Sequence, residues 1–319
     1  MALVIHGILD SADSFAIADD SIINKLLDEG FEVWAGNNRG TKYGCTHVSE
    51  KNTSAKFWAF SFDEMAKYDV PAFYKKIMEE TQVEKITLIA HSQGGTQSFA
   101  ALSEFEDIQN KTERFIALAP VLFMNRFPEN PNIFYWLAKF DIPQIMEILG
   151  VNYLTFIDIA QNPIFGVIID LFCVKTSVVC KFFFHMTTDK DPNFLDFENM
   201  KHYLSYIPSG ASRMSFQHYT QLMFTQSPKF AKYDYGKKKN LEIYGTETPP
   251  VYDISKIKTK TAIFYGDNDN LCTLDNVGFI NDIKKDIENY YMDQWGHLEY
   301  TWGKNKAHFF KKFEEALKL

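Results

Sequence analysis

Cysteine, metal-binding clusters and nucleotide-binding loops are scarce or missing in this sequence. Its 319 residues include four cysteines, a number that fits either an oxidising or a reducing compartment. No group of His, Cys, Asp and Glu residues has the spacing of a metal site, and no Gly-rich loop is of the kind that cradles phosphates. We therefore expect neither a metal nor a cofactor.

A long uncharged hydrophobic run is also lacking. The most apolar stretch, residues 164–184, is interrupted by Asp170, Lys175 and Lys181, whereas a membrane-spanning helix needs about 20 nearly uncharged residues. We interpret the stretch as a buried or amphipathic helix pair and expect no transmembrane segment. Met1 is followed at once by a strand-like run, so we expect no signal peptide.

Positive charge is too sparse to suggest binding to nucleic acid. The net charge is −8, and the lysines at 237–239 form the only notable basic run. A short lysine run is typical of a solvated loop, so we expect no nucleic-acid partner.

Apolar residues, by contrast, are plentiful. They make up 46% of the chain, and aromatic residues 16%, which is enough for a large core in one domain with an insertion or in two domains. Strand-like and helical stretches alternate, which predicts an α/β fold with a mostly parallel sheet covered by helices on both faces. The expected strands are 2–5, 31–36, 85–90, 114–120, 260–266 and 287–292, and the expected helices are 20–29, 64–80, 95–105, 274–285 and 305–318.

The alternation breaks between residues 121 and 255. This region is rich in Phe, Tyr, Ile and Met, and its periodicity is mostly helical. Because it lies between two strands of one expected sheet, we interpret 121–255 as a helical cap inserted between two parts of the core, 1–120 and 256–319.

Local signals also mark helix starts and a fixed loop. A capping box runs from Ser61 to Glu64. Asp69 and Pro71 indicate a second helix start, since proline is tolerated in a first turn. Arg39, in "GNNRG", is expected to fix a loop together with its asparagine neighbours.

The clearest chemical signal is the run Ala90-His91-Ser92-Gln93-Gly94. It follows an apolar, β-branched stretch and precedes a helical one. A serine flanked by small residues two positions away, at a strand–turn–helix junction, is typical of a nucleophile elbow, which forces the serine out at the carboxyl end of the sheet. We predict Ser92 as the nucleophile, with Ala90, His91 and Gly94 supporting the turn. The alternative is a serine in an ordinary turn.

An elbow serine requires an acid and then a histidine later in the chain. Asp267 and Asp269 both follow the strand expected at 260–266, so the spacing leaves both open. His297 lies in a turn after the last expected strand. We expect it to take the proton of Ser92 while the acid orients its ring.

Two backbone amides are expected to stabilise the oxyanion of acyl transfer. One is the N–H of Gln93, directly after the nucleophile, and the other is that of Ile8, in the turn after the first strand. His6 in that turn could act as a base, but we favour a structural role for it.

Taken together, these motifs resemble those of the acid lipases, the α/β-hydrolase group of gastric lipase and lysosomal acid lipase. The resemblance implies that Asp269, rather than Asp267, is the triad acid, and it agrees with the roles given to the serine, the histidine and the two amides. It also implies that 121–255 is a cap and lid over an acyl pocket. The matching segments are "HGIL" (6–9), "GNNRG" (36–40), "FWAFSFDEMAKYDVPA" (57–72), "AHSQGG" (90–95), "NDNL" (268–271) and "HLEYTWG" (297–303).

The sequence also departs from the acid lipases. Ala90 stands where these lipases have Gly, and Glu299-Tyr300 stands where Asp-Phe is usual. The resemblance implies further strands and a signal peptide ahead of the first turn, which are not seen here, so we expect the strand at 31–36 to form a bare sheet edge. By resemblance, the protein is secreted or lysosomal.

The cysteines and two sequons carry weaker signals. We expect Cys45 and Cys272 to be small buried hydrophobic residues. Cys173 and Cys180 either pair, as cap cysteines do in the resembled lipases, or stay unpaired on one helix. Glycosylation sequons at Asn52 and Asn110 favour secretion only weakly.

The function that these residues favour is a serine ester hydrolase that cleaves lipid esters, triacylglycerols, steryl esters or both, through an acyl-enzyme. A lipid–water interface is then an expected partner. Two alternatives stay open: a small-ester or thioester hydrolase, and a ligand-binding protein that has lost turnover. The apolar cap disfavours the small-ester or thioester hydrolase, and the complete triad disfavours a protein without turnover. The cap aromatics could, however, simply be the core of a second helical layer.

Overall fold

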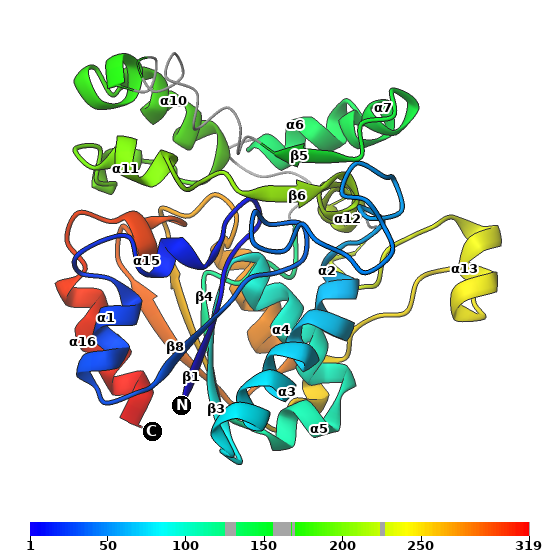
Figure 1. Ribbon diagram of the computed structural model, residues 1–319, viewed down its shortest axis with the longest axis horizontal. Coiled ribbons are helices and arrows are strands. Elements are labelled where there is room, and N and C mark those ends of the chain that lie inside the picture. Colours follow the sequence, from blue (N-terminus) through cyan, green and yellow to red (C-terminus); the bar gives the residue numbers. More distant parts are fainter. Residues whose placement is uncertain (125–131, 156–166, 168–169, 224–226, 319) are drawn as a thin grey trace.

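Six apolar stretches of the chain pair as one parallel sheet in the computed structural model, which describes residues 1–124, 132–155, 167, 170–223 and 227–318. The strand order is β2-β1-β3-β4-β7-β8, and every pairing is parallel (Figure 1). The predicted α/β-hydrolase architecture is confirmed, and β2 lies at a sheet edge as expected. The strands are β1 (Ala2–Ile5), β2 (Val33–Gly36), β3 (Ile86–His91), β4 (Thr112–Leu118), β7 (Thr261–Gly266) and β8 (Ile287–Met292).

Helices cover both faces of this sheet, as the alternating pattern predicted. One face is covered by α1 (Ile22–Asp28) and α16 (Ala307–Lys318), whereas α3 (Val70–Thr81), α4 (Gln93–Glu104) and α14 (Leu274–Ile283) cover the other (Figure 1). Parallel strands buried on both faces read as continuous apolar runs, and β3 is buried along its whole length.

Aromatic rings close the core on the α16 side. The rings of Phe309 and Phe313 pack against Phe264 of β7, with centroids 5.4 and 6.2 Å apart. All three side chains are fully buried. Because α16 is amphipathic, this aromatic face anchors the C-terminal helix to the sheet and thereby fixes the turn that precedes it.

The helix expected over 64–80 is continuous but not uniform. The capping box is confirmed, because the Ser61 side chain accepts a hydrogen bond and the Glu64 carboxylate accepts one from the Ser61 N–H at 2.7 Å. The chain then runs through α2 (Phe62–Glu64), a π-helical turn η2 (Met65–Asp69) and α3.

The predicted second helix start is confirmed in part, because α3 begins at Val70 with Pro71 in its first turn, but Asp69 does not cap it. Asp69 has helical dihedral angles and caps nothing. Its carboxylate instead accepts hydrogen bonds from Arg39, at 2.7 Å from Nη2 and 2.9 Å from Nε, which fixes the loop after β2 as expected of Arg39. Pro71 lacks an N–H, and it follows directly on the π-helical turn, at the start of α3, where proline is tolerated.

Most elements between β4 and β7 lie over the carboxyl ends of the strands, whereas α13 (Lys237–Tyr244) projects to one side and η5 (Ile254–Lys256) packs against α4 (Figure 1). They are mostly helical, but two of them pair as a small antiparallel sheet that the helical pattern did not predict. They are α6 (Ile133–Lys139), α7 (Ile142–Ile148), β5 (Tyr153–Thr155), η3 (Asp170–Lys175), α10 (Val178–Thr187), η4 (Pro192–Phe194), α11 (Met200–Leu204), β6 (Gly210–Ser212), α12 (Arg213–Met223), α13 (Lys237–Tyr244) and η5 (Ile254–Lys256).

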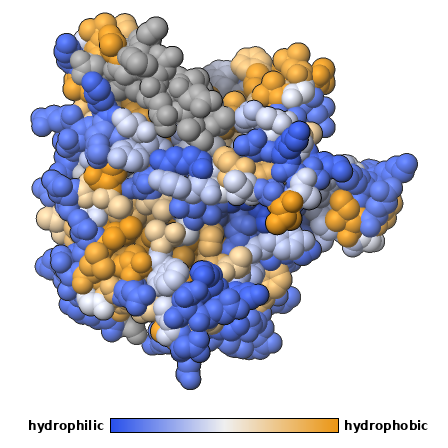
Figure 2. Space-filling model, viewed as in Figure 1, coloured by the Kyte–Doolittle hydropathy of each residue, from blue (hydrophilic) through white to orange (hydrophobic). Residues whose placement is uncertain are grey.

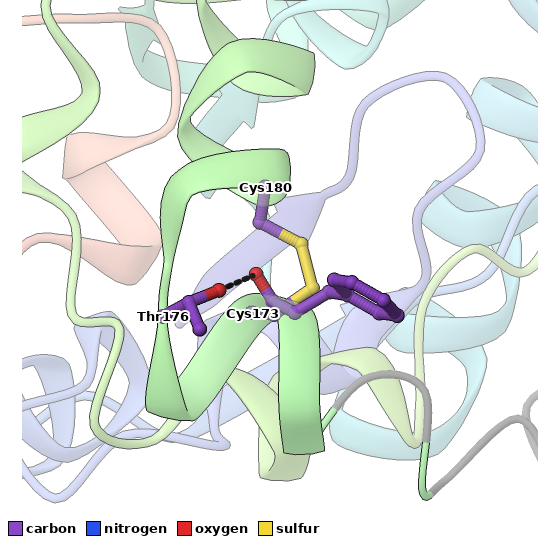
Figure 3. The surroundings of a disulfide bond; sticks show 4 residues. Cys173, Thr176 and Cys180 are labelled. Atoms are coloured by element: carbon purple, nitrogen blue, oxygen red, sulfur yellow. Dashed lines mark hydrogen bonds between the residues drawn. A yellow bond between two sulfur atoms is a disulfide. The ribbon is translucent and has the colours of Figure 1, made fainter.

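The apolar stretch at 164–184 forms an amphipathic helical hairpin where it is described; residues 164–166, 168 and 169 lie outside the described residues. The hairpin consists of η3 and α10, joined by a disulfide between Cys173 and Cys180 (Figure 3). Cys173, Cys180 and Phe184 point inward, whereas neighbouring apolar side chains face outward. In the described part of the chain, no helix combines the length and apolarity needed to cross a membrane.

The two other cysteines differ from each other. Cys272 is fully buried, as expected, whereas Cys45 is only half-buried, with its Sγ 2.7 Å from the Thr41 carbonyl oxygen. Asn52 and Asn110 of the two sequons are both exposed.

We predict that the Cys173–Cys180 disulfide is present in protein produced in an oxidising compartment. The disulfide closes a short loop and is expected to stabilise the folded protein by about 2 kcal/mol. Reducing it should therefore lower the melting temperature by a few degrees. Intact-mass analysis with and without reductant, followed by peptide mapping, measures the pairing. Two free thiols at these positions in such material would contradict it.

Candidate active site

Ser92 occupies the turn between β3 and α4, in a backbone conformation that few residues adopt. Its φ is 53° and its ψ −120°, which is a strained geometry for a residue with a side chain. The strain is sustained by close packing, because a Cβ at Gly94 would lie only 2.4 Å from the Ile5 carbonyl oxygen. Ala90, where the acid lipases have Gly, is buried within the sheet ladder beside Ile5.

The structure brings Ser92, His297 and Asp269 together at the carboxyl edge of the sheet. His297 Nε2 lies 2.8 Å from Ser92 Oγ, and its Nδ1 lies 2.8 Å from Asp269 Oδ2. The three side chains follow β3, β8 and β7 respectively, and each residue is at most 5% exposed. This arrangement can move a proton from the hydroxyl to the imidazole while the carboxylate holds the ring.

The two aspartates after β7 have different surroundings. Asp269 Oδ1 accepts hydrogen bonds from the N–H groups of Leu271 at 2.6 Å and Cys272 at 2.8 Å, which leaves Oδ2 for the imidazole. Asp267 instead accepts a hydrogen bond from the Gln294 N–H at 2.7 Å. Of the two aspartates that the spacing left open, Asp269 is therefore the one that contacts the histidine.

Burial and charge act in opposite directions on His297. Burial alone would lower its pKa, but the charge and hydrogen bond of Asp269, with a smaller contribution from Asp189, raise the pKa above the ordinary histidine value. The imidazolium is therefore well stabilised in this site, which suits a base that must carry the proton during a reaction.

The loop after β1 packs directly against Ser92. A Cβ at Gly7 would lie 3.0 Å from Ser92 Cβ and 3.4 Å from Ser92 Oγ, and Ile8 is the next residue of this loop. Among the described residues, neither the Ile8 N–H nor the Gln93 N–H donates to another protein group. Both amides can therefore donate to a ligand oxygen at this point.

His6 has the surroundings of a structural residue. Its Nε2 accepts a hydrogen bond from the Asn38 N–H at 3.1 Å, and its Nδ1 lies 2.8 Å from the Gly7 carbonyl oxygen. Burial lowers its pKa to about 4, against a raising effect of the Gly7 carbonyl. The neutral ring therefore links the first turn to the loop after β2.

Sequence reasoning missed the groups that hold the turn at 296–298. His91 Nε2 lies 2.9 Å from the His297 carbonyl oxygen, and Glu299 accepts a hydrogen bond from the Gly296 N–H at 2.7 Å. Asp189, in the cap, accepts one from the Leu298 N–H at 3.3 Å. The first two are near recognisable motifs, but no local pattern connects Asp189 to the histidine.

Two hollows lie away from Ser92, His297 and Asp269, and the residues that form them carry mixed charges. One, at the amino ends of β3, β4 and β7, is lined by residues such as Lys85, Glu104 and Lys260. The smaller is bordered by Phe194, Trp295 and neighbouring polar residues. Within the described residues, no three His, Cys, Asp or Glu side chains are placed to hold a metal ion.

Comparison with known sequences links the chain to ester hydrolases. The alpha/beta hydrolase fold family matches residues 3–144. Gastric triacylglycerol lipase of Rattus norvegicus is 31% identical over 310 residues, which cover 93% of this chain and 74% of that protein. Lysosomal acid lipase/cholesteryl ester hydrolase of the same species is 29% identical over 304 residues, with the same coverage. Lipase member J of Homo sapiens is 30% identical and is covered to 81%.

Solved structures with low sequence identity share the fold. A mutant epoxide hydrolase from Bacillus megaterium superposes with a TM-score of 0.58 at 13% identity, covering 100% of this chain and 93% of that one. A thermophilic esterase from Thermogutta terrifontis gives 0.52 at 14% identity, with 99% and 89% coverage. These two similarities concern the architecture alone.

We predict that Asp269→Asn cripples ester hydrolysis and that Asp267→Asn does not. Loss of the carboxylate that orients the imidazole is expected to lower kcat by about 10⁴-fold, as in serine proteases. The Asp267 carboxylate accepts a hydrogen bond from the Gln294 N–H and interacts with Tyr291 rather than with His297, so its asparagine variant serves as the matched control. Steady-state kinetics on both purified variants test this, and a crippled Asp267→Asn beside an active Asp269→Asn would contradict the assignment.

Proposed function

Because this chain belongs to the acid lipase family of the α/β-hydrolase fold and is a carboxylic ester hydrolase, we propose that Ser92, His297 and Asp269 form its catalytic triad. The observation that carries the proposal is the pair of 2.8 Å contacts of His297, one to the hydroxyl and one to the carboxylate. A ligand-binding protein without turnover would have no need of this geometry.

The proposed reaction proceeds through an acyl-enzyme. Ser92 Oγ attacks the ester carbonyl carbon while its proton passes to His297 Nε2. The oxyanion accepts hydrogen bonds from the Ile8 and Gln93 amides. The intermediate collapses, the C–O bond to the alcohol breaks, and His297 protonates the departing alkoxide. Water, deprotonated by the same imidazole, then attacks the acyl carbon and releases the carboxylic acid and Ser92.

The burial of Ser92 and His297 supports a cap that opens to admit substrate. Ser92 is 5% exposed and His297 2%, so a bulky ester cannot reach the hydroxyl in the observed arrangement. Cap elements bind the loops around the site: the Ser209 N–H donates to the Leu9 carbonyl oxygen at 2.6 Å, and the Asn132 side chain donates to the Asn270 carbonyl oxygen at 2.7 Å. We propose that the cap shifts when substrate enters.

The outer face of the cap supports a lipid substrate. Apolar side chains crowd the exposed side of the η3–α10 hairpin and of the α6–α7 pair (Figure 2). These side chains form two separate apolar areas, which we together call the cap patch. Large exposed apolar patches are typical of interaction sites, and a lipid surface is the partner that fits an ester hydrolase. The cap patch comprises Phe140, Ile145, Ile148, Leu149, Leu171, Phe172, Val178, Val179, Phe182 and Phe183.

Other cap aromatics form core. Phe134 stacks on Phe216 with centroids 6.1 Å apart and packs against Tyr219 at 5.4 Å, and all three are buried. This layer is what a small-ester hydrolase on the same fold would also need. The buried aromatic layer therefore does not distinguish a small-ester hydrolase from a lipase. The exposed cap patch, in contrast, favours lipid esters such as triacylglycerols or steryl esters.

A secreted or lysosomal location is in keeping with these features. The relatives named above are gastric and lysosomal lipases. The disulfide between Cys173 and Cys180 is of a kind that persists in oxidising compartments, and both sequon asparagines are exposed. We propose that the mature protein acts outside the cytosol.

We predict that a fluorescent alkyl phosphonate labels Ser92 and no other serine. Its reactive phosphorus mimics the attacked carbonyl, and only a serine paired with a base is activated for attack. Peptide mapping locates the adduct, and Ser92→Ala is expected to abolish both labelling and ester turnover. An adduct elsewhere, or unchanged turnover in Ser92→Ala, would refute the proposed nucleophile.

We predict preference for long-chain, water-insoluble esters, with activity rising at a lipid interface. Each buried methylene contributes roughly 0.8 kcal/mol, so a long acyl chain binds an apolar pocket much more tightly than a short one. The measurement is the initial rate against concentration for a short-chain ester through its solubility limit, beside an emulsified long-chain ester.

Variants of the cap patch sharpen this test. Replacing Phe182 and Phe183 by Ser should reduce activity on the emulsion while leaving the dissolved ester unaffected. Leu241 and Ile243 on α13, which projects away from the elements over the sheet, are also exposed apolar residues, and their Ser variants are the control. Turnover confined to dissolved esters, with no rise at the interface, would favour the small-ester alternative.

A further inference from the structure

A strap that follows α10 pairs with the loop that carries the triad acid. The Lys190 N–H donates to the Asn268 carbonyl oxygen at 2.7 Å, and the Asn270 N–H donates to the Thr188 carbonyl oxygen at 3.0 Å. Asp189 thus faces Asp269 as in an antiparallel pair. The cap is therefore joined by backbone hydrogen bonds to the same loop that positions the acid.

Asp189 itself is completely buried behind the histidine. One carboxylate oxygen accepts the hydrogen bond from the Leu298 N–H, and the other contacts the Thr188 hydroxyl. The carboxylate lies flat against Gly296, because a Cβ there would come within 1.9 Å of Asp189 Oδ1. A side chain at 296 would consequently displace either the carboxylate or the turn.

Three buried side chains therefore hold three successive residues of the turn that presents the imidazole. Glu299 binds the Gly296 N–H from within the turn, and His91 contacts the His297 carbonyl oxygen from β3. Asp189 binds Leu298, and it alone of the three comes from the cap. We propose that Asp189 is a positioning residue for the catalytic base, holding the turn of His297 in register with Asp269 and tying α10 to the triad.

The charges around Asp189 make this role measurable. Burial raises the pKa of Asp189 to about 7; the Thr188 hydrogen bond opposes the shift, Asp269 adds to it, and the charge of His297 lowers the pKa. Glu299, on the short helix α15 (Glu299–Trp302), has its pKa raised to about 8 by burial. Burial likewise lowers the pKa of His91 to about 3, so that ring stays neutral.

The sign of the electrostatic effect follows from these neighbours. A negative Asp189 favours the imidazolium of His297 and raises its pKa. Removing that charge should lower the histidine pKa, so the free base would persist to lower pH. A carboxylate that merely filled space would leave the titration of His297 unchanged.

The experiment compares Asp189→Asn and Asp189→Ala with Asp191→Ala. Asparagine can keep both hydrogen bonds, accepting from Leu298 and donating to Thr188, but it carries no charge. Alanine loses the hydrogen bonds and the charge. Asp191 lies on the same strap, and its exposed carboxylate accepts hydrogen bonds from Asn193 rather than from the turn at 296–298, so it controls for disturbance of the strap.

Kinetics on a soluble ester separate positioning from stability, and this readout rests on the proposed function. Asp189→Ala should lower kcat by up to about 10²-fold, as expected for a slightly misplaced catalytic group, with little change in KM. Asp189→Asn should restore most of kcat, yet the acidic limb of its kcat/KM profile should move to lower pH. An Asp189→Ala enzyme that matches Asp191→Ala in kcat and in the acidic limb would overturn the proposal.

A second readout needs no turnover. The proton on His297 Nδ1, hydrogen-bonded to Asp269, should give a far-downfield NMR signal whose pH dependence reports the histidine pKa. That pKa should fall in Asp189→Asn relative to the unmodified protein. If Asp189→Ala fails to fold, an unchanged histidine pKa in Asp189→Asn overturns the positioning role. Absence of ester turnover in the unmodified protein would instead contradict the proposed function. The NMR titration would then still test whether Asp189 is a positioning residue.

Discussion

The two hydrogen bonds of His297 are the contacts on which the rest of the site depends. The imidazole reaches Ser92 with one nitrogen and Asp269 with the other, each at 2.8 Å, so loops from three distant parts of the chain must meet at one point. A parallel sheet makes this meeting possible, because the carboxyl ends of β3, β7 and β8 share one edge. The core, in this sense, serves as the frame that aligns three loops.

Burial strengthens these contacts and also makes them costly. The carboxyl groups of Asp269, Asp189 and Glu299 are all buried at His297 or at the turn that carries it, and an unpaired buried charge is strongly unfavourable. The chain resolves this in two ways. Backbone N–H groups of Leu271 and Cys272 bind the Asp269 carboxylate, while burial raises the pKa values of Asp189 and Glu299 so that they carry less charge near neutral pH.

The sheet and the elbow could be predicted from sequence because their signals are local. An apolar run before Ser92 and a helical one after it define the turn within a few residues. The choice of Asp269 over Asp267 rested on resemblance, since both lie in the same loop and only the fold decides which carboxylate faces the histidine.

Other features depend on tertiary contacts that no short pattern records. Asp189 reaches the turn of His297 because the strap after α10 pairs with the loop after β7. The pairing of β5 with β6 joins Thr155 to Gly210, which are far apart in the chain. The sequence predicts Asp69 as a helix cap, but its carboxylate instead accepts hydrogen bonds from Arg39 in another loop. The charged partner thus outweighs the local capping preference.

The most direct test of the account is to trap the covalent intermediate itself. The protein is mixed with a chromogenic long-chain ester, quenched in acid within milliseconds and digested, and the peptides are weighed. The account predicts a burst of released alcohol no larger than the enzyme concentration, together with the acyl group on the peptide that contains Ser92. Turnover with neither burst nor adduct under conditions that make deacylation slow, or an acyl group on a different residue, would contradict it.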